Sequence, residues 1–271
     1  GDIAIAFMIA FMTAFMATPH TINLANKVGA VDEPKDERRI NKVTMPRLGG
    51  LAIIAGFLVS IIYLLIILSV ENTINLLEDN NHMKLLGFLI GGLIISIVCF
   101  IDDLKDLPPL VKLVAQILAA IVVVGFGLRI ENINVPFLYK IGLPNVFSVI
   151  LTIGWIVGIT NAINLIDGLD GLSSGVALIS CVSMLIIFAL NGSPIIAILL
   201  ITALAGALSG FLPFNFNPAK IFMGDSGSMF LGFIISIIFT VYILTHILLN
   251  FNSFLVKINK IYHFIVIFTN L

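Results

Sequence analysis

The chain has 271 residues, of which 59% are hydrophobic and 11% are charged, and its formal net charge is −1. Because about a quarter of the residues of an ordinary soluble domain are charged, this composition excludes a soluble globular protein and indicates a chain solvated by lipid. The near-neutral charge gives no reason to expect a nucleic-acid partner. The two cysteines, Cys99 and Cys181, fall in apolar runs, so we predict neither a disulfide nor a zinc site.

Apolar runs of about 20 residues, the length that crosses a bilayer as a helix, recur along the whole sequence. Short polar stretches separate them, without a soluble domain or an internal repeat. We therefore predict an all-α fold, a polytopic transmembrane helical bundle. Eight runs are clear: 3–20, 48–70, 84–101, 111–128, 146–163, 173–190, 194–212 and 228–248. A ninth, near 260–271, is weaker, and the first lacks the basic start and cleavage site of a removed signal peptide.

The lysine and arginine residues are concentrated near the first span. Segment 23–47 holds six of the 14, and such clusters mark cytoplasmic loops, so we place this segment in the cytoplasm. Counting spans from there assigns a side to every other loop. The remaining inner loops are 102–110, 161–172 and 213–227. The outer loops are 71–83, 129–145, 191–193 and 249–259. Most of the acidic and amide residues that follow fall on the inner side.

The run CFIDDLKDLPPLVKL places Asp102 and Asp103 at the end of a span, before a double proline that can start the next helix. An ionised aspartate near hydrocarbon costs about 3 kcal/mol unless it is paired or hydrated, so these residues are candidates for function. The alternative is a solvated loop whose acids balance Lys105 and Lys112.

In the run GITNAINLIDGLDGLSSG, polar residues recur at every third position, at Asn161, Asn164, Asp167 and Asp170. On a helix, neighbours in such a series lie about 60° apart, so we expect them to form one polar stripe. Two glycines within the run would let the backbone approach a ligand closely. The alternative is a polar hairpin between two spans.

A third run, FLPFNFNPAKIFMGDSGSMFLGF, places Asp225 just before a span. Backbone N–H groups and the helix dipole can meet an anion at such a position. A carboxylate there also suits magnesium, which prefers oxygen ligands and takes one or two carboxylates together with substrate phosphate and water. The alternative is that Asp225 only caps its helix.

The first inner loop, VDEPKDERRINKVTMPRLGG, mixes acids with cations. Phosphate binding is a candidate role for Arg38, Arg39, Lys42 and Arg47. The alternative is that these cations set the topology and attract anionic lipid headgroups.

The chain contains four stretches that together resemble the signature of the polyprenyl-phosphate N-acetylhexosamine-1-phosphate transferase family: PRLGGLAI, FIDDLKDLPP, NAINLIDGLDGL and NPAKIFMGDSGSMFLG. Their order and their placement in inner loops are also similar, over about residues 20–240. The resemblance implies a magnesium-dependent enzyme in which the phosphate of undecaprenyl phosphate attacks the β-phosphorus of a UDP-sugar and releases UMP. It also implies a multi-pass protein of the bacterial inner membrane, with the active site facing the cytoplasm.

Carried over by motif, the resemblance implies roles for individual residues. Asp102 and Asp103 would serve the polyprenyl phosphate or its deprotonation, and Asp225 would bind magnesium. The nucleotide side of the site would be formed by Asn164, Asp167, Asp170, Asn215 and Phe222. The choice of a base is left open, because a phosphate nucleophile is already ionised near neutral pH and its positioning can carry the rate.

Within the family, PRLGG resembles the branch that uses UDP-N-acetylglucosamine to start teichoic-acid linkage units, lipopolysaccharide O-antigen or related envelope polymers. The branch that uses the muramoyl-pentapeptide donor tends to carry a GTPTMGG-like run there, which VTMPRLGG is not. We predict N-acetylglucosamine, with the muramoyl-pentapeptide as runner-up. Two rival hypotheses are a truncated inactive paralogue and a secondary transporter, although a transporter site would lie near the bilayer midplane. A homodimer is left open.

The end of the chain differs from the family pattern. Relatives continue into another cytoplasmic loop with a histidine-rich HLHHR-like motif, whereas this chain ends in NFNSFLVKINKIYHFIVIFTNL. We expect a membrane-embedded domain over 1–248 and a divergent or truncated segment over 249–271.

Overall fold

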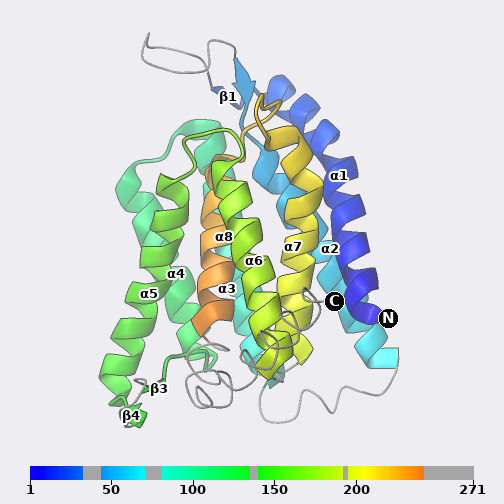
Figure 1. Cartoon of the computed structure of the whole chain (residues 1–271). Coiled ribbons are helices and arrows are strands. Elements are labelled where there is room, and N and C mark those ends of the chain that lie inside the picture. The colour runs from blue at the N-terminus through cyan, green and yellow to red at the C-terminus, as the bar shows by residue number, and fades with distance from the viewer. Residues whose placement is uncertain (33–43, 71–80, 135–139, 192–194, 241–271) are drawn as a thin grey trace, which may run out of the picture.

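A computed structural model of the chain describes residues 1–32, 44–70, 81–134, 140–191 and 195–240. These residues form a bundle of antiparallel helices with two short antiparallel strand pairs (Figure 1). The helices are α1 (Asp2–Val28), α2 (Gly49–Val70), α3 (Asn81–Lys105), α4 (Pro109–Gly125), α5 (Asn145–Leu165), α6 (Leu172–Asn191), α7 (Ile195–Asn215) and α8 (Gly224–Phe239). The paired strands are β1 (Val31–Asp32) with β2 (Met45–Pro46), and β3 (Asn132–Asn134) with β4 (Lys140–Gly142).

Each of the eight clear apolar runs corresponds to one helix, which confirms a polytopic all-α membrane protein. Within the described residues, six helices are long and apolar enough to cross a membrane: α1, α2, α3, α5, α6 and α7. Helices α4 and α8 are apolar but shorter, so their crossing stays a prediction. The ninth run, near 260–271, lies outside the described residues, as does the proposed segment 249–271.

The first helix continues well beyond the end that the sequence predicts, because Pro19 does not stop it. A proline inside a helix removes one backbone hydrogen bond. The side chain of Thr18 donates to the carbonyl oxygen of Ala14 at 2.7 Å, and the turns beyond the proline bury Thr21 and Ala25. Packing of this last part therefore outweighs the local cost of the proline.

Small residues let α1 approach α2 and α7 closely. A Cβ on Gly206 of α7 would overlap the carbonyl oxygen of Phe7, and one on Gly210 would overlap that of Phe11. On the other side, a Cβ on Gly56 of α2 would lie 2.7 Å from the carbonyl oxygen of Ala10. Close backbone approach of this kind drives helix association in lipid, where burial of apolar surface adds little.

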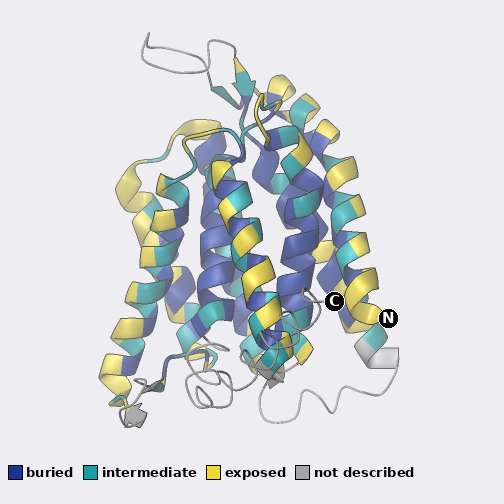
Figure 2. Ribbon diagram, viewed as in Figure 1, coloured by how far each residue is buried: buried dark blue, intermediate teal, exposed yellow. Residues whose placement is uncertain are grey.

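Helix α8 lies at the centre of the bundle and packs against α2, α3, α5, α6 and α7. Every residue over 226–238 is buried. Figure 2 shows the exposed residues on the outer faces of the surrounding helices, where lipid would contact them. The start of α8, whose first backbone N–H groups have no acceptor within the helix, lies where the ends of several helices meet.

The PRLGG stretch binds the start of α8 through backbone hydrogen bonds. The N–H of Phe222 donates to the carbonyl oxygen of Pro46 at 2.8 Å, and the N–H of Gly49 donates back to that of Phe222 at 3.0 Å. The N–H of Gly50 donates to the carbonyl oxygen of Met223 at 2.7 Å. The first N–H groups of α2 thus find partners outside their own helix, and α2 is joined to α8.

This contact predicts the effect of a methyl group at Gly50. A Cβ there would overlap the backbone of Gly227, so we expect Gly50→Ala to lower the free energy of unfolding by about 1–3 kcal/mol. Thermal unfolding in detergent, followed by a thiol-reactive dye that reports exposure of the buried Cys99 and Cys181, measures the change. Gly154→Ala is the matched control, because its Cβ meets nothing within 4 Å, and it should not destabilise the protein. Equal effects of the two substitutions would contradict the contact.

Candidate active site

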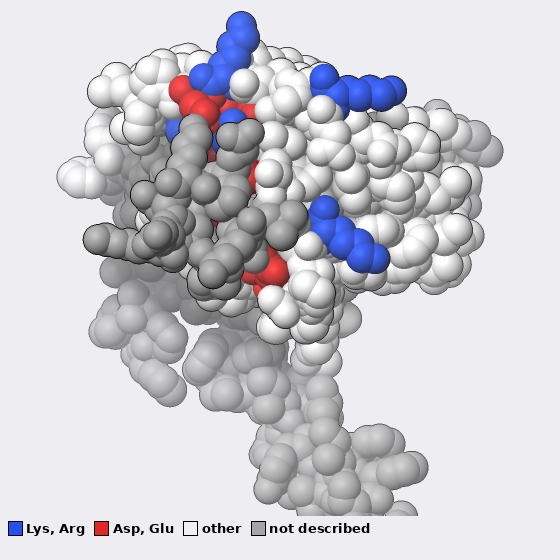
Figure 3. All heavy atoms as spheres, turned by 90° about the horizontal axis from the view of Figure 1, so that it is seen from above, with Lys and Arg blue, Asp and Glu red and all other residues white. Residues whose placement is uncertain are grey.

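The polar segments of the sequence meet at one end of the bundle, at the top of Figure 1. The C-terminal ends of α3, α5 and α7 lie there together with the N-terminal ends of α4, α6 and α8. Figure 3 looks onto this end and shows acidic side chains gathered in one region of its surface. The inner loops expected to share one side of the membrane therefore do share one end of the protein.

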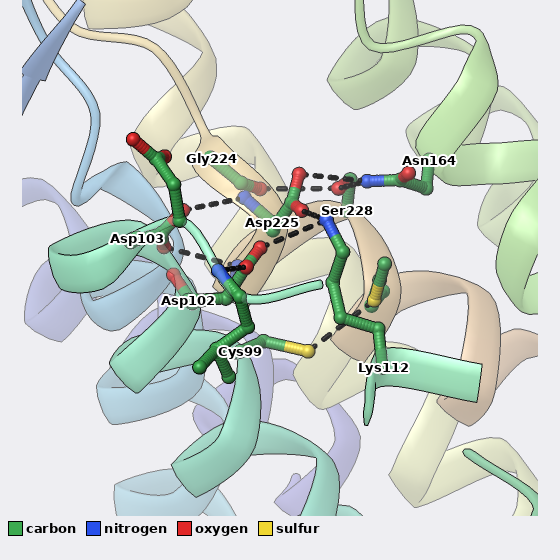
Figure 4. A network of polar contacts seen from close by, with 12 residues as sticks. Cys99, Asp102, Asp103, Lys112, Asn164, Gly224, Asp225 and Ser228 are labelled. Carbon is green, nitrogen blue, oxygen red and sulfur yellow. Dashed lines mark hydrogen bonds and ion pairs between the residues drawn. The ribbon is translucent and has the colours of Figure 1, made fainter. Parts of the chain in front are cut away.

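Asp103, in the last turn of α3, caps the N-terminus of α8. Its Oδ1 accepts a hydrogen bond from the N–H of Asp225 at 2.8 Å, and its Oδ2 accepts one from the N–H of Ser226 at 3.1 Å (Figure 4). These donors are free at a helix start, where a negative charge is also favoured by the helix dipole. Gly224, with φ 74°, allows this approach, since its Cβ would lie 2.9 Å from both Asp103 oxygens. Asp103 is 3% exposed and is occupied with holding α8 in place.

Arg47 holds the end of α3 through its guanidinium. Its Nε donates to the carbonyl oxygen of Asp103 at 2.9 Å, and its Nη2 donates to Oδ1 of Asp106 at 2.8 Å. A carbonyl in the last turn of a helix lacks an intrahelical partner, so the first contact satisfies it. The second is a surface ion pair, because the Asp106 side chain is 79% exposed, and it adds little stability. The guanidinium of Arg47 is therefore used within the protein, although the sequence made it a candidate for phosphate binding.

Lys112, on the first turns of α4, joins two carboxylates from different helices. Its Nζ donates to Oδ2 of Asp102 at 3.0 Å and to Oδ2 of Asp225 at 2.7 Å (Figure 4). The other Asp102 oxygen accepts the N–H of Leu107 at 2.7 Å. Asp102 is nearly buried, with a side chain 6% exposed, whereas that of Asp225 is 29% exposed. Asp225 is thus the member of the pair that solutes can reach more easily.

Asn164 fixes the second oxygen of Asp225. Its Nδ2 donates to Oδ1 of Asp225 and to Oγ of Ser228, both at 2.9 Å. The hydroxyl of Ser228 donates in turn to the carbonyl oxygen of Gly224 at 3.1 Å. The Asp225 carboxylate is therefore held between a lysine from α4 and an amide from α5, and only its free lone pairs remain for a ligand.

A polar layer lies one turn below this cluster. The side-chain amides of Gln116 on α4 and Asn161 on α5 bond to each other, at 2.6 Å and 3.4 Å. Gln116 also donates to the sulfur of Met229, which Cys99 contacts at 3.3 Å from the other side. Because Gln116 and Lys112 are four residues apart, this layer fixes the face of α4 that carries Lys112.

Asp167 lies beyond the end of α5, within the electrostatic reach of Asp225 and Asp103. Burial raises the pKa of Asp167 to about 7, and the negative charges of these two carboxylates add to the shift. Within the described part of the chain, no hydrogen bond or ion pair reaches its carboxylate. Asp167 therefore adds a further acidic group whose charge is not compensated.

The prediction of one helical stripe is wrong for two of its four members. Helix α5 ends at Leu165, so Asn161 and Asn164 lie on it, whereas Asp167 and Asp170 lie in the turn that leads to α6. This turn contains Gly168 and Gly171, and Gly171 adopts a positive φ. The alternative of a polar hairpin between two spans describes this part of the run better.

Asp170 and Asn215 join the loop after α5 to the loop before α8. Oδ2 of Asp170 accepts the N–H of Ala219 at 3.0 Å. Asn215 is 3% exposed; its Oδ1 accepts the hydroxyl of Ser174 at 2.6 Å, and its Nδ2 donates to the carbonyl oxygen of Ile221 at 3.0 Å. The buried Asn215 thus shapes the loop that carries Phe222, which is itself half-buried, rather than presenting its amide at the surface.

Among the basic residues near the site, the structure describes Lys112 but not three residues of the first inner loop. Arg38, Arg39 and Lys42 lie outside the described residues, so their predicted role in substrate binding stays a prediction. The sequence suggests for Lys112 only a role in balancing the acidic charge of its loop, whereas in the structure it contacts both Asp102 and Asp225. The signal that points to it is a single lysine at the start of an otherwise apolar helix, a position where a charge needs a partner.

The donor set of this cluster fits magnesium. Among the described residues, no three histidine, cysteine, aspartate or glutamate side chains are placed so as to hold a metal on their own. Magnesium commonly binds one or two carboxylates and takes its remaining ligands from phosphate and water. The partly exposed carboxylate of Asp225, beside Asp102, can supply that share. Asp102, Asp103, Asp167 and Asp225 also carry more negative charge than the single ammonium of Lys112 offsets.

A family model described as glycosyl transferase family 4 matches residues 85–243, which include most of α3 and all of α4 to α8. A probable undecaprenyl-phosphate N-acetylglucosaminyl 1-phosphate transferase of Bacillus subtilis is 39% identical over 240 residues, which cover 87% of this chain and 62% of the relative. A decaprenyl-phosphate N-acetylglucosaminephosphotransferase of Mycobacterium tuberculosis is 34% identical, over 87% of this chain and 59% of the relative.

A phospho-N-acetylmuramoyl-pentapeptide-transferase of Staphylococcus haemolyticus is 36% identical over 83% of this chain and 72% of the relative. These similarities confirm the family that the four sequence stretches indicated and give no support to a transporter. The chain spans about three fifths of the length of the first two relatives.

Because the pKa of Asp167 is raised, we predict that removing its charge increases the stability of the folded protein, by an amount that depends on pH. An unfolded aspartate ionises near pH 4, whereas Asp167 in the folded protein ionises only near pH 7, so the folded protein loses stability as the pH rises from about 4 to 7. We expect Asp167→Asn to escape this loss. Its thermal midpoint in EDTA should exceed that of the unsubstituted protein by an amount that grows from pH 5 to pH 8 and reaches about 2–4 °C. A difference in thermal midpoint that does not change with pH would contradict the raised pKa of Asp167.

Proposed function

The chain belongs to glycosyl transferase family 4, and we propose that it transfers N-acetylglucosamine 1-phosphate from UDP-N-acetylglucosamine to undecaprenyl phosphate. The observation that carries the proposal is the cluster of Asp102, Lys112, Asn164 and Asp225 at one end of an apolar bundle. Such a site can meet a lipid phosphate at the membrane surface and a water-soluble nucleotide at the same time.

The reaction needs no redox partner and no proton. An oxygen of the polyprenyl phosphate forms a bond to the β-phosphorus of the UDP-sugar, and the bond from that phosphorus to the oxygen bridging it to the α-phosphorus breaks. UMP leaves with the bridging oxygen, and the sugar remains on a lipid pyrophosphate. Because both reactants are anions, the protein has to align them and offset their charge.

The residues of the cluster divide this work. We assign Lys112 and the cation held by Asp225 to charge compensation, and Asn164 to keeping the Asp225 carboxylate in a fixed orientation. Asp103 acts as a positioning residue, because it holds the helix start that carries Asp225. Asp102 holds the ammonium of Lys112 in place. None of these assignments requires a base, since the phosphate nucleophile is ionised at neutral pH.

The cation that we propose is Mg²⁺, bound by Asp225 with Asp102 beside it. When bound, it would polarise the β-phosphoryl group and neutralise charge on the leaving UMP. The surplus of carboxylates over cations in the described site supports this choice. The nucleotide would lie along Asp167 and Phe222, on the loops that Asp170 and Asn215 hold together.

We propose that this end of the bundle faces the cytoplasm of a bacterial inner membrane. The lysines and arginines of segment 23–47 support this orientation through the positive-inside rule. The UDP-sugar donor that the family resemblance implies is found in the cytoplasm. A site that faces the cytoplasm could therefore reach this donor.

Two donors compete within the family. The names of the B. subtilis and M. tuberculosis relatives favour N-acetylglucosamine, and the PRLGG stretch points the same way. The S. haemolyticus relative keeps the muramoyl-pentapeptide donor as the second candidate. Membranes that express this chain should therefore be assayed with each labelled UDP-sugar and undecaprenyl phosphate, with and without magnesium. Lipid product from the muramoyl donor alone would overturn the choice of N-acetylglucosamine.

We predict that Asp225→Asn lowers the magnesium-dependent transfer rate by at least about 100-fold, because losing about 3 kcal/mol of charge stabilisation slows a reaction by that factor. The variant should still fold, since asparagine retains the shape and an oxygen acceptor for Asn164. Asp106→Asn removes an acidic charge from the same end of the protein at a 79% exposed side chain, and transfer should stay within about twofold. A normal rate in Asp225→Asn would exclude its role with the metal.

A further inference from the structure

Lys112 occupies the position between two carboxylates that a divalent cation would also need. Its Nζ lies 3.0 Å from Oδ2 of Asp102 and 2.7 Å from Oδ2 of Asp225, so one ammonium joins α3 to α8 (Figure 4). The Lys112 side chain is 21% exposed, so it lies at the edge of the bundle and is not fully enclosed by it.

The other basic residue beside the cluster does not share this task. The guanidinium of Arg47 donates instead to the carbonyl oxygen of Asp103 and to Asp106. Among the described residues, Lys112 is thus the cation in contact with both carboxylates. Without it, two ionised groups would face each other at the edge of an apolar bundle, at a considerable electrostatic cost.

An ammonium and a divalent cation cannot both use the same oxygens at short range. Like charges a few ångströms apart repel strongly where water is partly excluded. Lysine suits an exchange of partners, because its compact charge sits on a flexible chain of four carbons and makes no fixed fork of hydrogen bonds. The ammonium can thus move aside without breaking the contacts of Asn164 or Asp103.

We propose that Lys112 is a resident counter-cation that competes with the divalent cation for Asp102 and Asp225. In the metal-free protein it offsets part of the charge of the pair and keeps α3, α4 and α8 together. Binding of a divalent ion displaces the ammonium from the Asp225 oxygen. The affinity of the protein for the ion is therefore weaker than it would be if the two carboxylates had no ammonium beside them. This inference rests on the proposed function for the identity of the cation, but its consequence for metal binding does not depend on catalysis.

The test is a titration of the purified, substrate-free protein with Mn²⁺, with free Mn²⁺ measured by electron paramagnetic resonance. We expect Lys112→Met to bind Mn²⁺ at least about tenfold more tightly than the unsubstituted protein, because the competing charge is gone. Lys105→Met is the matched control, since it removes a positive charge from an exposed position at the same end of the bundle. Its affinity should change by less than about twofold, as expected for a solvent-screened charge.

A second variant covers failure of Lys112→Met to fold. Lys112→Arg keeps the charge but offers a planar fork that is harder to displace from carboxylates, so its affinity for Mn²⁺ should equal that of the unsubstituted protein or be weaker. Weaker or unchanged Mn²⁺ binding by Lys112→Met, or tighter Mn²⁺ binding by Lys112→Arg, would contradict the proposed competition between Lys112 and the ion.

The two proposals fail separately, because the titration contains no sugar donor or lipid. Loss of Mn²⁺ binding in Asp225→Asn would place the ion at this cluster even if no transfer were observed. Absence of Mn²⁺ binding by the unsubstituted protein would overturn the inference about Lys112, whatever the transfer assay gives.

Discussion

The site depends on one interaction, the capping of α8 by the carboxylate of Asp103. The start of a helix carries free N–H groups that need acceptors, and α8 is buried at the centre of the bundle, where water cannot supply them all. Asp103 provides both acceptors from the end of α3. The same contact places the Asp225 carboxylate beside Lys112 and Asn164. The Asp103 side chain therefore both caps a buried helix and brings the groups of the acidic site together.

The remaining features of the site support this contact from several sides. Arg47 holds the carbonyl of Asp103, and the PRLGG backbone binds the segment just before α8, so the ends of α2, α3 and α8 form one unit. The amide pair of Gln116 and Asn161 sets α4 against α5. These contacts keep several carboxylates close together despite their mutual repulsion. A charge cluster that is held in advance suits a reaction between two anions, where alignment and charge compensation carry the rate.

The sequence predicts the helices well because lipid imposes length and composition on every span. It also identifies Asp102, Asp103 and Asp225 as unusual, since charges at the ends of apolar runs require an explanation. It does not predict that Asp103 would bond to backbone groups 122 positions away. The spacing of the polar residues also does not reveal that α5 ends before Asp167, because a helix can either continue through a glycine-containing segment or end before it. The role of Lys112 is not predicted for a related reason. A single lysine forms no sequence motif, and its two partners become apparent only in the folded structure.

The most direct test of this account is hydrogen exchange of the backbone over residues 224–228 in Asp103→Asn, compared with the unsubstituted protein. Hydrogen bonds to a charged acceptor contribute about 1.5–3 kcal/mol each, so weakening this cap should speed exchange there by about tenfold or more. Exchange in α7, over 195–215, should not change, which serves as the internal control. Unchanged exchange at the start of α8 in a folded variant would show that Asp103 does not hold this helix, and the account of the site would be contradicted.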